Sequence, residues 1–266
     1  MMDMTLHSQI DPCTLPPPLL TSEPGSFAYH TFKVRIPRII EETNETNSFP
    51  TDIRSALEEL RAEVMGGAIR GLREAAPDKP FWGRASHPYL GRTWLDVPWY
   101  WAEAFVYRRL LEATRYFQPG PWHGFDPYST KKQTEWAPEA APRAVSVVLH
   151  DLPSDPRARF EGLLHASLWG NRTDLSYNVA AQIGEAQRED ERANLVVDDS
   201  GRVWEFLHAQ PRRRLALIAD NAGTELLMDL ALIDFLLDEN LAGEVVLYLK
   251  PQPFFVSDAM PRDVEA

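Results

Sequence analysis

The stretch LALIADNAGTELLMDLALIDFLL, residues 215–237, reads as a strand, a polar turn and a helix in direct succession. The five apolar residues 215–219 have the length and composition of a buried strand in a parallel sheet. After the turn, apolar residues recur at helical spacing, and Thr224 stands where a helix N-cap is expected. Asp220 and Asn221 therefore follow the carboxyl end of a strand, which is where open α/β sheets bind their ligands.

A second strand of the same kind lies nearer the C-terminus, at residues 244–250, and ends in Lys250. Two strands joined by a helix of this length should be parallel neighbours, so we expect Lys250 and the later Asp258 beside Asp220 and Asn221. Oxygen ligands suit a hard divalent ion such as Mg²⁺ or Mn²⁺, and a lysine beside them suits a phosphate. Because Asp and Asn are also common turn formers, the spacing alone is equally consistent with a plain turn.

Four ordered motifs carry a family resemblance. They are Asp220-Asn221-x-Gly223-x-Glu225, Lys250-x-x-Pro253-x-Phe255-Val256-Ser257-Asp258, SLWGNRTDLS at residues 167–176 and PWYWAEAFVYRR at residues 98–109. From about Ser26 to Asp258 the chain resembles the damage-control phosphatases, which are metal-dependent enzymes with an α/β/α fold. The similarity is to the sugar-phosphate phosphatase branch, which includes the protein called acidic residue methyltransferase.

The resemblance implies a fold class, and the composition along the chain indicates a domain organisation. We expect an α/β/α doubly wound sandwich preceded by a mainly helical N-terminal subdomain. Residues 1–25 would be a flexible Pro-rich tail, residues 26–150 the helical subdomain and residues 151–266 the α/β metal-binding domain. Six of the eight tryptophans fall between Trp82 and Trp136, which favours a helical subdomain anchored by large side chains.

The resemblance also implies a set of site residues and a cofactor. The expected catalytic residues and metal ligands are Asp220, Asn221 and Asp258, and the expected substrate-binding residues are Asn171, Asp174, Glu225 and Lys250. The metal is expected to be Mn²⁺ or Mg²⁺, with Co²⁺ or Ni²⁺ as alternatives. Without the resemblance, Asp174 is better explained as a helix cap, since its carboxylate can accept from free backbone N–H groups.

Composition limits the classes of partner. The net charge of −12 argues against a nucleic-acid backbone or an anionic membrane surface as partner. Cys13 is the only cysteine, so an internal disulfide and a multi-cysteine metal site are excluded, and a reducing compartment is favoured. The first residues lack the pattern of a signal peptide, and no apolar run has transmembrane length. We therefore expect a cytoplasmic protein. The resemblance implies a small phosphorylated metabolite as its partner, and no oligomeric state is indicated.

Three local patterns give further predictions. Residues 51–74 are expected to form an amphipathic helix, which the glycine pair at Gly66 can end early. Residues 157–167 are expected to form a helix that leads into a polar loop. Residues 194–199 are predicted to be a strand that ends in a tight turn at Gly201. The two aspartates at that strand end do not match the Asp-x-Asp pattern of aspartyl-nucleophile phosphatases.

The function implied by the resemblance is hydrolysis of small phosphometabolites, with sugar phosphates such as fructose 1-phosphate as expected substrates. Family members continue well past the Val-Ser-Asp motif, so this chain is expected to be C-terminally truncated. The alternative is therefore a truncated, non-catalytic homologue that binds a phosphometabolite or a protein partner. A protein carboxyl methyltransferase ranks lower, because the sequence has no glycine-rich loop of the kind that cradles S-adenosylmethionine.

Overall fold

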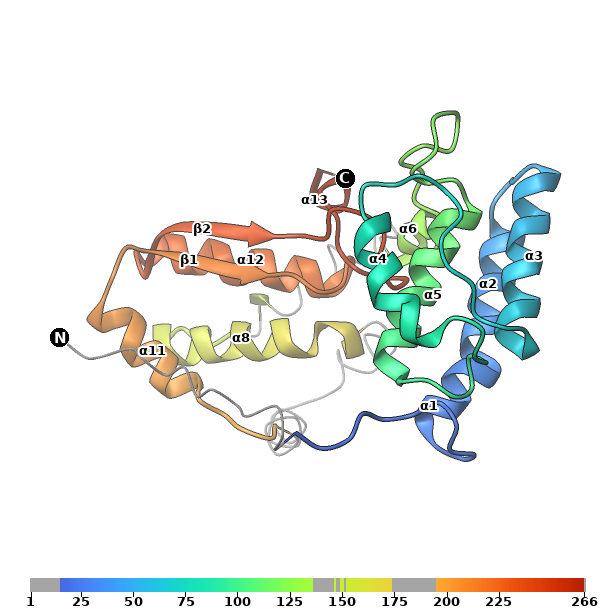
Figure 1. Cartoon of the computed structure of the whole chain (residues 1–266). Coiled ribbons are helices and arrows are strands. Elements are labelled where there is room, and N and C mark those ends of the chain that lie inside the picture. Colours follow the sequence, from blue (N-terminus) through green and yellow to red (C-terminus); the bar gives the residue numbers. More distant parts are fainter. Residues whose placement is uncertain (1–14, 136–145, 147–148, 151, 174–194, 266) are drawn as a thin grey trace. The chain divides into compact units, whose positions relative to one another are not determined.

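The chain divides into two compact units, Met1–His123 and Gly124–Ala266, in a computed structural model (Figure 1). The structure describes residues 15–135, 146, 149–150, 152–173 and 195–265. The division falls earlier than the boundary we expected after residue 150. The segment that follows His123 belongs with the C-terminal unit because buried Lys132 pairs there with Asp263.

The N-terminal unit consists of helices joined by loops in its described part. Its elements are α1 Phe27–His30, η2 Thr31–Arg35, α2 Ile36–Thr46, α3 Thr51–Gly66, α4 Lys79–Ser86, η3 His87–Tyr89 and α5 Trp99–Ala113. Helix α3 ends at the glycine pair, well before Glu74, the end of the predicted helix. A Cβ atom on Gly67 would lie 2.8 Å from the Cα of Glu63, so this close C-terminal turn requires a glycine.

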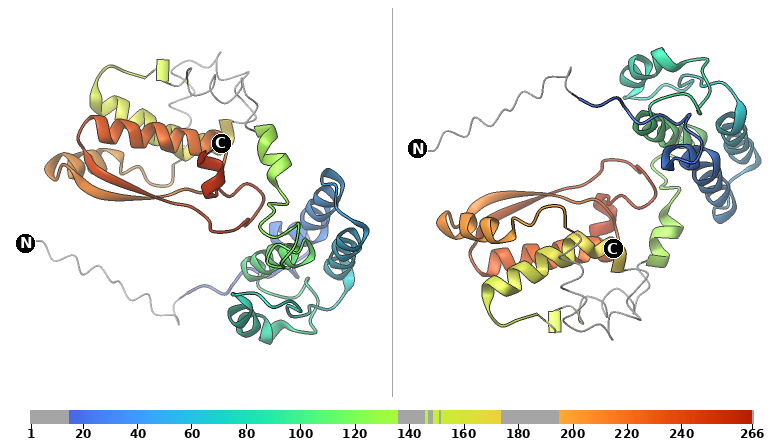
Figure 2. Two further views of the ribbon diagram at one scale, coloured as in Figure 1. Left: turned by 90° about the horizontal axis from the view of Figure 1, so that it is seen from above. Right: turned by 90° about the horizontal axis from the view of Figure 1, so that it is seen from below.

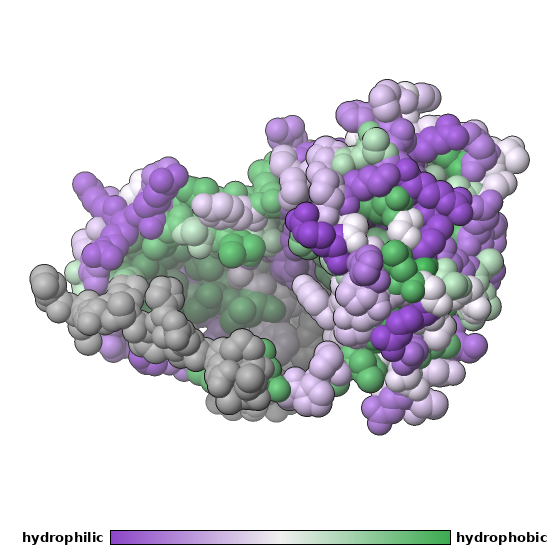
Figure 3. Space-filling model, in the orientation of Figure 1, coloured by the Kyte–Doolittle hydropathy of each residue, from purple (hydrophilic) through white to green (hydrophobic). Residues whose placement is uncertain are grey.

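Aromatic side chains form the centre of this unit. Trp94 is fully buried, and its ring stacks with those of Phe32, Trp101 and Phe105 at centroid distances of 5.8, 6.4 and 5.9 Å. The helical N-terminal part expected from the tryptophan-rich sequence is thus confirmed. Hydrophilic residues cover most of the visible face of this unit (Figure 3).

Two consecutive arginines of α5 are buried among carboxylates. Arg108 pairs with Asp78 at 2.7 Å, and Arg109 pairs with Glu63 at 2.8 Å. Glu112, one turn later, accepts hydrogen bonds from the Arg70 side chain and from two backbone N–H groups. The carboxylate of Glu112 therefore ties the segment after α3 to α5.

Glu112 should make this unit sensitive to acid. Burial alone raises its pKa, but the hydrogen bonds from Arg70 and from the backbone outweigh burial, so the pKa lies below its usual value. A lowered folded-state pKa contributes stability above the unfolded pKa of about 4.3, and this stability is lost as the pH falls through the folded-state pKa. We expect Glu112→Gln to lower the free energy of unfolding by about 2 kcal/mol at pH 7. The difference should shrink below pH 4.

Thermal melting of both proteins across pH 3 to 7 measures this effect. The matched control is Glu42→Gln, because Glu42 pairs with Arg38 on the exposed surface. Such a surface pair is worth at most about 1 kcal/mol. Equal losses of stability in the two variants, or a loss in Glu112→Gln that does not change with pH, would contradict the assignment.

The C-terminal unit contains a two-stranded parallel sheet and helices in its described part. Its elements are α6 Ser129–Glu135, α8 Pro156–Thr173, α11 Ser200–Ala209, β1 Arg213–Ile218, α12 Thr224–Asp238, β2 Ala242–Tyr248 and α13 Pro261–Glu265. Strands β1 and β2 pair in parallel, with Leu215 opposite Val245 and Ile218 opposite Tyr248. The strand, turn and helix predicted from residues 215–237 and the parallel second strand are confirmed. The expectation that the first strand is buried is wrong, because the residues of β1 are exposed or half-buried.

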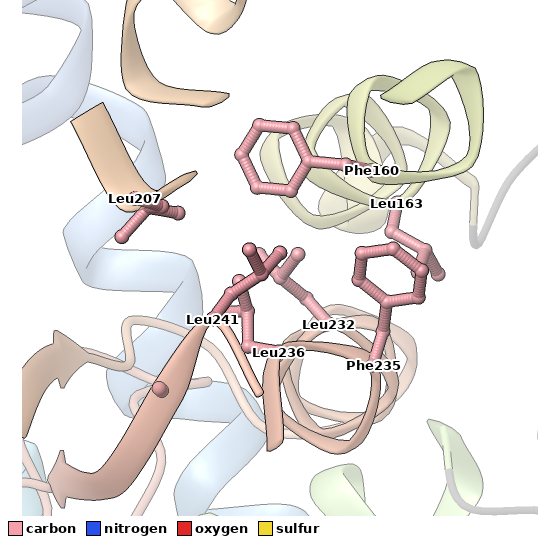
Figure 4. Close-up of a cluster of buried hydrophobic side chains, with 8 residues drawn as sticks. Phe160, Leu163, Leu207, Leu232, Phe235, Leu236 and Leu241 are labelled. Atoms are coloured by element: carbon pink, nitrogen blue, oxygen red, sulfur yellow. The ribbon is translucent and has the colours of Figure 1, made fainter. Parts of the chain in front are cut away.

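The core of this unit lies where α12 packs against α8 and against one face of the sheet (Figures 1 and 2). Phe160 and Leu163 of α8 meet Leu232 and Phe235 of α12 (Figure 4), and Leu207 of α11 joins them. The other sheet face carries Ile218 and Tyr248, which are 79% and 56% exposed. This packing fixes the carboxyl end of β1 against the start of α12.

The predicted strand at residues 194–199 is wrong within the described residues. Residues 195–199 are irregular, and Val196 is fully exposed, so this apolar run has no sheet to join. The carboxylate of Asp198 instead accepts a 3.0 Å hydrogen bond from the backbone N–H of Ser200, where α11 begins. Gly201 consequently lies inside a helix and not in a tight turn.

Candidate metal and phosphate site

The turn between β1 and α12 is shaped by a glycine. Gly223 has a φ of 82°, a value that favours glycine, and it occupies the N-cap position of α12. Thr224, which we predicted as the N-cap, is the first residue of the helix. This geometry places Asp220 and Asn221 between the end of the strand and the N-terminus of the helix.

The loop after β2 is hydrogen-bonded to this turn. Asn221 and Asp258 form an antiparallel bridge, in which the N–H of Ala222 donates to the carbonyl of Ser257 at 2.7 Å. The N–H of Ala259 donates to the carbonyl of Asp220, also at 2.7 Å. The structure therefore brings together Asp220, Asn221 and Asp258, which are far apart in the sequence.

Side-chain contacts orient the polar groups of the turn. The Nδ2 group of Asn221 donates to Glu225 at 2.9 Å and to Asp220 at 3.2 Å, while its Oδ1 accepts from Ser257 at 2.6 Å. The ammonium of Lys250 lies 2.8 Å from Oδ2 of Asp258. Asp220 is exposed, whereas Asn221 and Asp258 are buried, so Asp220 offers its carboxylate to solvent at the edge of the site.

Three buried or half-buried carboxyls surround this turn with raised pKa values. Burial is the main cause for Glu225, Asp229 and Asp258, and the charge of Asp220 adds to the increase in each. Hydrogen bonds from Asn221 lower the pKa of Glu225, and Lys250 lowers that of Asp258. The site thus concentrates negative charge, which a bound cation would relieve.

The last turn of α8 approaches the same place. A Cβ atom on Gly170 would lie 2.5 Å from the Cα of Glu225, so only a glycine allows the two helices this close. Asn171 follows in the helix, not in the polar loop we predicted, because α8 continues to Thr173. The side chain of Asn171 and the whole of Asp174 lie outside the described residues, so their substrate-binding roles stay predictions.

Sequence reasoning missed two residues of this region. Asp229 is buried and accepts a hydrogen bond from Ser167 of α8. Asp229 lies one helical turn after Glu225, on the face of α12 that carries buried residues, and this position could have indicated that it lies near the site. Lys132 also reaches this region, where it donates to the backbone carbonyl of Asp258, and nothing in the local sequence indicated that contact.

The donor set of this site fits a hard divalent cation in its chemistry. Two carboxylates and one amide offer oxygen atoms only, which is the preference of Mg²⁺ and Mn²⁺. Across residues 15–135, 146, 149–150, 152–173 and 195–265, no group of three or more His, Cys, Asp or Glu side chains is arranged to hold a metal ion. The expected ligand set of Asp220, Asn221 and Asp258 has only two such residues.

Among the helices in this same part of the chain, none has the length and apolar character needed to cross a membrane.

Comparison with known proteins identifies the family. Residues 31–266 match the family model of the damage-control phosphatase ARMT1-like domain. The chain is 30% identical to damage-control phosphatase ARMT1 of Danio rerio and 29% identical to that of Homo sapiens, covering 94% of this chain and 66% of the relative in both comparisons. The chain therefore spans just under two thirds of the length of these relatives.

A solved structure supports the fold class. The crystal structure of a DUF89 family protein from Pyrococcus horikoshii aligns with a TM-score of 0.50 at 19% identity, covering 90% of this chain and 67% of that protein. This likeness confirms the α/β fold with a helical N-terminal part. On the evidence of the family model, the chain belongs to the ARMT1-like damage-control phosphatases.

Proposed function

We propose that this chain is a metal-dependent phosphatase that hydrolyses small phosphorylated metabolites, with sugar phosphates such as fructose 1-phosphate as substrates. The observation that carries the proposal is the convergence of Asp220, Asn221 and Asp258 beside Lys250. They meet at the carboxyl end of parallel strands, the place where α/β sheets bind ligands. Membership of a family whose named relatives are phosphatases supports the same reaction.

Each residue of the site has its own role in this proposal. Asp220, Asn221 and Asp258 would hold the divalent ion, with Mn²⁺ or Mg²⁺ as the first candidates. When bound, such an ion supplies Lewis-acid polarisation of the phosphoryl group and acidifies a water molecule. Glu225 holds the Asn221 amide through its 2.9 Å hydrogen bond, which leaves the amide oxygen on the opposite side for Ser257 and the cation.

The phosphate itself meets two further features of the chain. The ammonium of Lys250 offers a positive charge beside Asp258 that can neutralise phosphate oxygens. The first backbone N–H groups of α12, next to Gly223, lack partners within the helix and attract anions. Asn171 and Asp174 remain proposed contacts for the hydroxyl groups of the sugar.

Phosphate release by the full chain tests the proposal. We expect turnover of fructose 1-phosphate and of an aryl phosphate in the presence of Mn²⁺, and Mg²⁺, Co²⁺ and Ni²⁺ are compared in parallel. A chelator should reduce the rate by at least about 100-fold, because an uncoordinated site loses several kcal/mol of transition-state stabilisation. Turnover that persists in chelator would contradict a metal-dependent reaction.

The same assay separates the proposal from a binding role. A folded chain that binds Mn²⁺ but releases no phosphate from either substrate would favour the non-catalytic homologue. A chain that hydrolyses only the aryl phosphate would retain the reaction class but reject sugar phosphates as the substrate.

A further inference from the structure

A buried lysine from a distant part of the sequence contacts the backbone of Asp258. Lys132 of α6 is only 3% exposed. Its ammonium donates to the carbonyl oxygen of Asp258 at 2.7 Å and to the carboxylate of Asp263 at 2.9 Å, and lies 3.2 Å from the carboxylate of Asp126. An ammonium has three N–H donors, so these three oxygen partners match its full capacity.

The two carboxylates that face Lys132 are themselves fixed. Asp126 is 1% exposed and accepts a 2.9 Å hydrogen bond from the N–H of Tyr128, just before α6. Asp263 of α13 accepts a 2.8 Å hydrogen bond from the N–H of Met260. Lys132 therefore joins the segment before α6 to Asp258 and to α13.

The backbone on both sides of Asp258 is held as well. The residue after it, Ala259, donates its N–H to the carbonyl of Asp220 at 2.7 Å and accepts from the N–H of Lys250 at 2.9 Å. The residue before it, Ser257, accepts from Ala222. Backbone hydrogen bonds thus hold the residues on either side of Asp258, and the Lys132 side chain holds the carbonyl oxygen of Asp258 itself.

Fold stability alone gives little reason for this arrangement. Burying an ammonium and two carboxylates removes strong hydration, and apolar residues of similar size often stabilise a protein equally well or better. A buried ion cluster is better suited to fixing one conformation of a polar loop. Each N–H group of the ammonium must point at its acceptor oxygen, so the oxygens of the loop are held in one arrangement. Here the fixed element is the main chain of an expected metal ligand.

We propose that Lys132, held by Asp126 and Asp263, is a positioning residue that fixes the Asp258 main chain and so holds the Asp258 carboxylate in place as a ligand for the cation. This inference rests on the proposed function, because it assumes that Asp258 is a metal ligand. The cluster acts through Asp258 and touches neither the cation nor the substrate.

The test is Mn²⁺ binding to the full chain, measured by electron paramagnetic resonance of free Mn²⁺ at a temperature where every variant is folded. We expect Lys132→Met to weaken Mn²⁺ binding by about 10- to 100-fold, the usual effect of removing a group that orients a metal ligand. The matched control is Leu207→Ala, a core substitution in the same unit that lowers stability but leaves the turn intact. It should leave Mn²⁺ affinity unchanged.

Asp126→Asn is measured alongside, because losing the buried ammonium can unfold the unit. This variant keeps the side-chain shape and the hydrogen bond to Tyr128, and it should weaken Mn²⁺ binding by a few fold. The inference is overturned if neither folded variant weakens Mn²⁺ binding more than Leu207→Ala. A folded wild-type chain that binds no Mn²⁺ would overturn the proposed function and this inference together, so the two failures are distinguishable.

Discussion

Replacing Asp220 by alanine is expected to reduce metal-dependent phosphate release by about 1000-fold or more and to remove Mn²⁺ binding. Asp220 is the exposed carboxylate of the turn, adjacent to the buried Asn221 and bridged through it to Asp258. Without it the site keeps one carboxylate and one amide. Loss of cation-based stabilisation costs several kcal/mol of activation free energy, and each tenfold in rate corresponds to about 1.4 kcal/mol.

The same substitution should not destabilise the fold. The charge of Asp220 raises the pKa of Glu225, Asp229 and Asp258, so it repels three carboxylates that burial already disfavours in their charged form. Removing that charge relieves the repulsion at neutral pH. The thermal midpoint of the metal-free variant should therefore equal or exceed that of the wild type.

Phosphate release, Mn²⁺ titration and thermal melting together check this prediction. Asp234→Ala serves as control, since it removes an equal charge from an exposed position of α12, nine residues beyond Glu225 and about 13 Å further along the helix. Retained turnover in Asp220→Ala would reject the ligand assignment. A large drop in its melting temperature would show that Asp220 supports the fold and not only the site.

The order of the C-terminal elements could be predicted because the local pattern and the final packing agree there. The apolar run before Asp220 and the helical spacing after it each had one natural explanation, and a strand–helix–strand unit has one common arrangement. That arrangement then brings the two strand ends together. Asn221 and Asp258 meet for this reason, although no local signal connects them.

For other parts of the chain the prediction was wrong or was not made, because burial there depends on distant segments. The run at Val196 has the composition of a strand, but it finds no sheet partner and remains exposed. Helix α8 continues through Asn171 because the missing side chain of Gly170 lets it pack against α12. Lys132 contacts Asp258 across 126 residues, a separation that neither periodicity nor motif spacing can reveal.

Lys250→Met should distinguish two possible roles of Lys250, which are to hold the Asp258 carboxylate and to bind the substrate phosphate. The Lys250 ammonium lies 2.8 Å from Asp258, and its side chain is one third exposed, so it can pair with that carboxylate and also reach a phosphate at the surface. As a phosphate-binding cation, it stabilises charge that grows in the transition state. Its loss should then reduce kcat by about 100- to 1000-fold, as for the removal of other preorganised donors.

Mn²⁺ affinity in the same variant decides between these roles, because Lys250 and a divalent ion compete for the Asp258 carboxylate. Removing the ammonium leaves Asp258 without that ion pair, so Mn²⁺ should bind Lys250→Met at least as tightly as the wild type while turnover falls. Lys33→Met, an equal change at an exposed lysine of the N-terminal unit, should alter neither quantity. If Mn²⁺ affinity and turnover instead fall together, Lys250 serves chiefly to hold Asp258 in place, and the phosphate charge must be met by the N-terminus of α12.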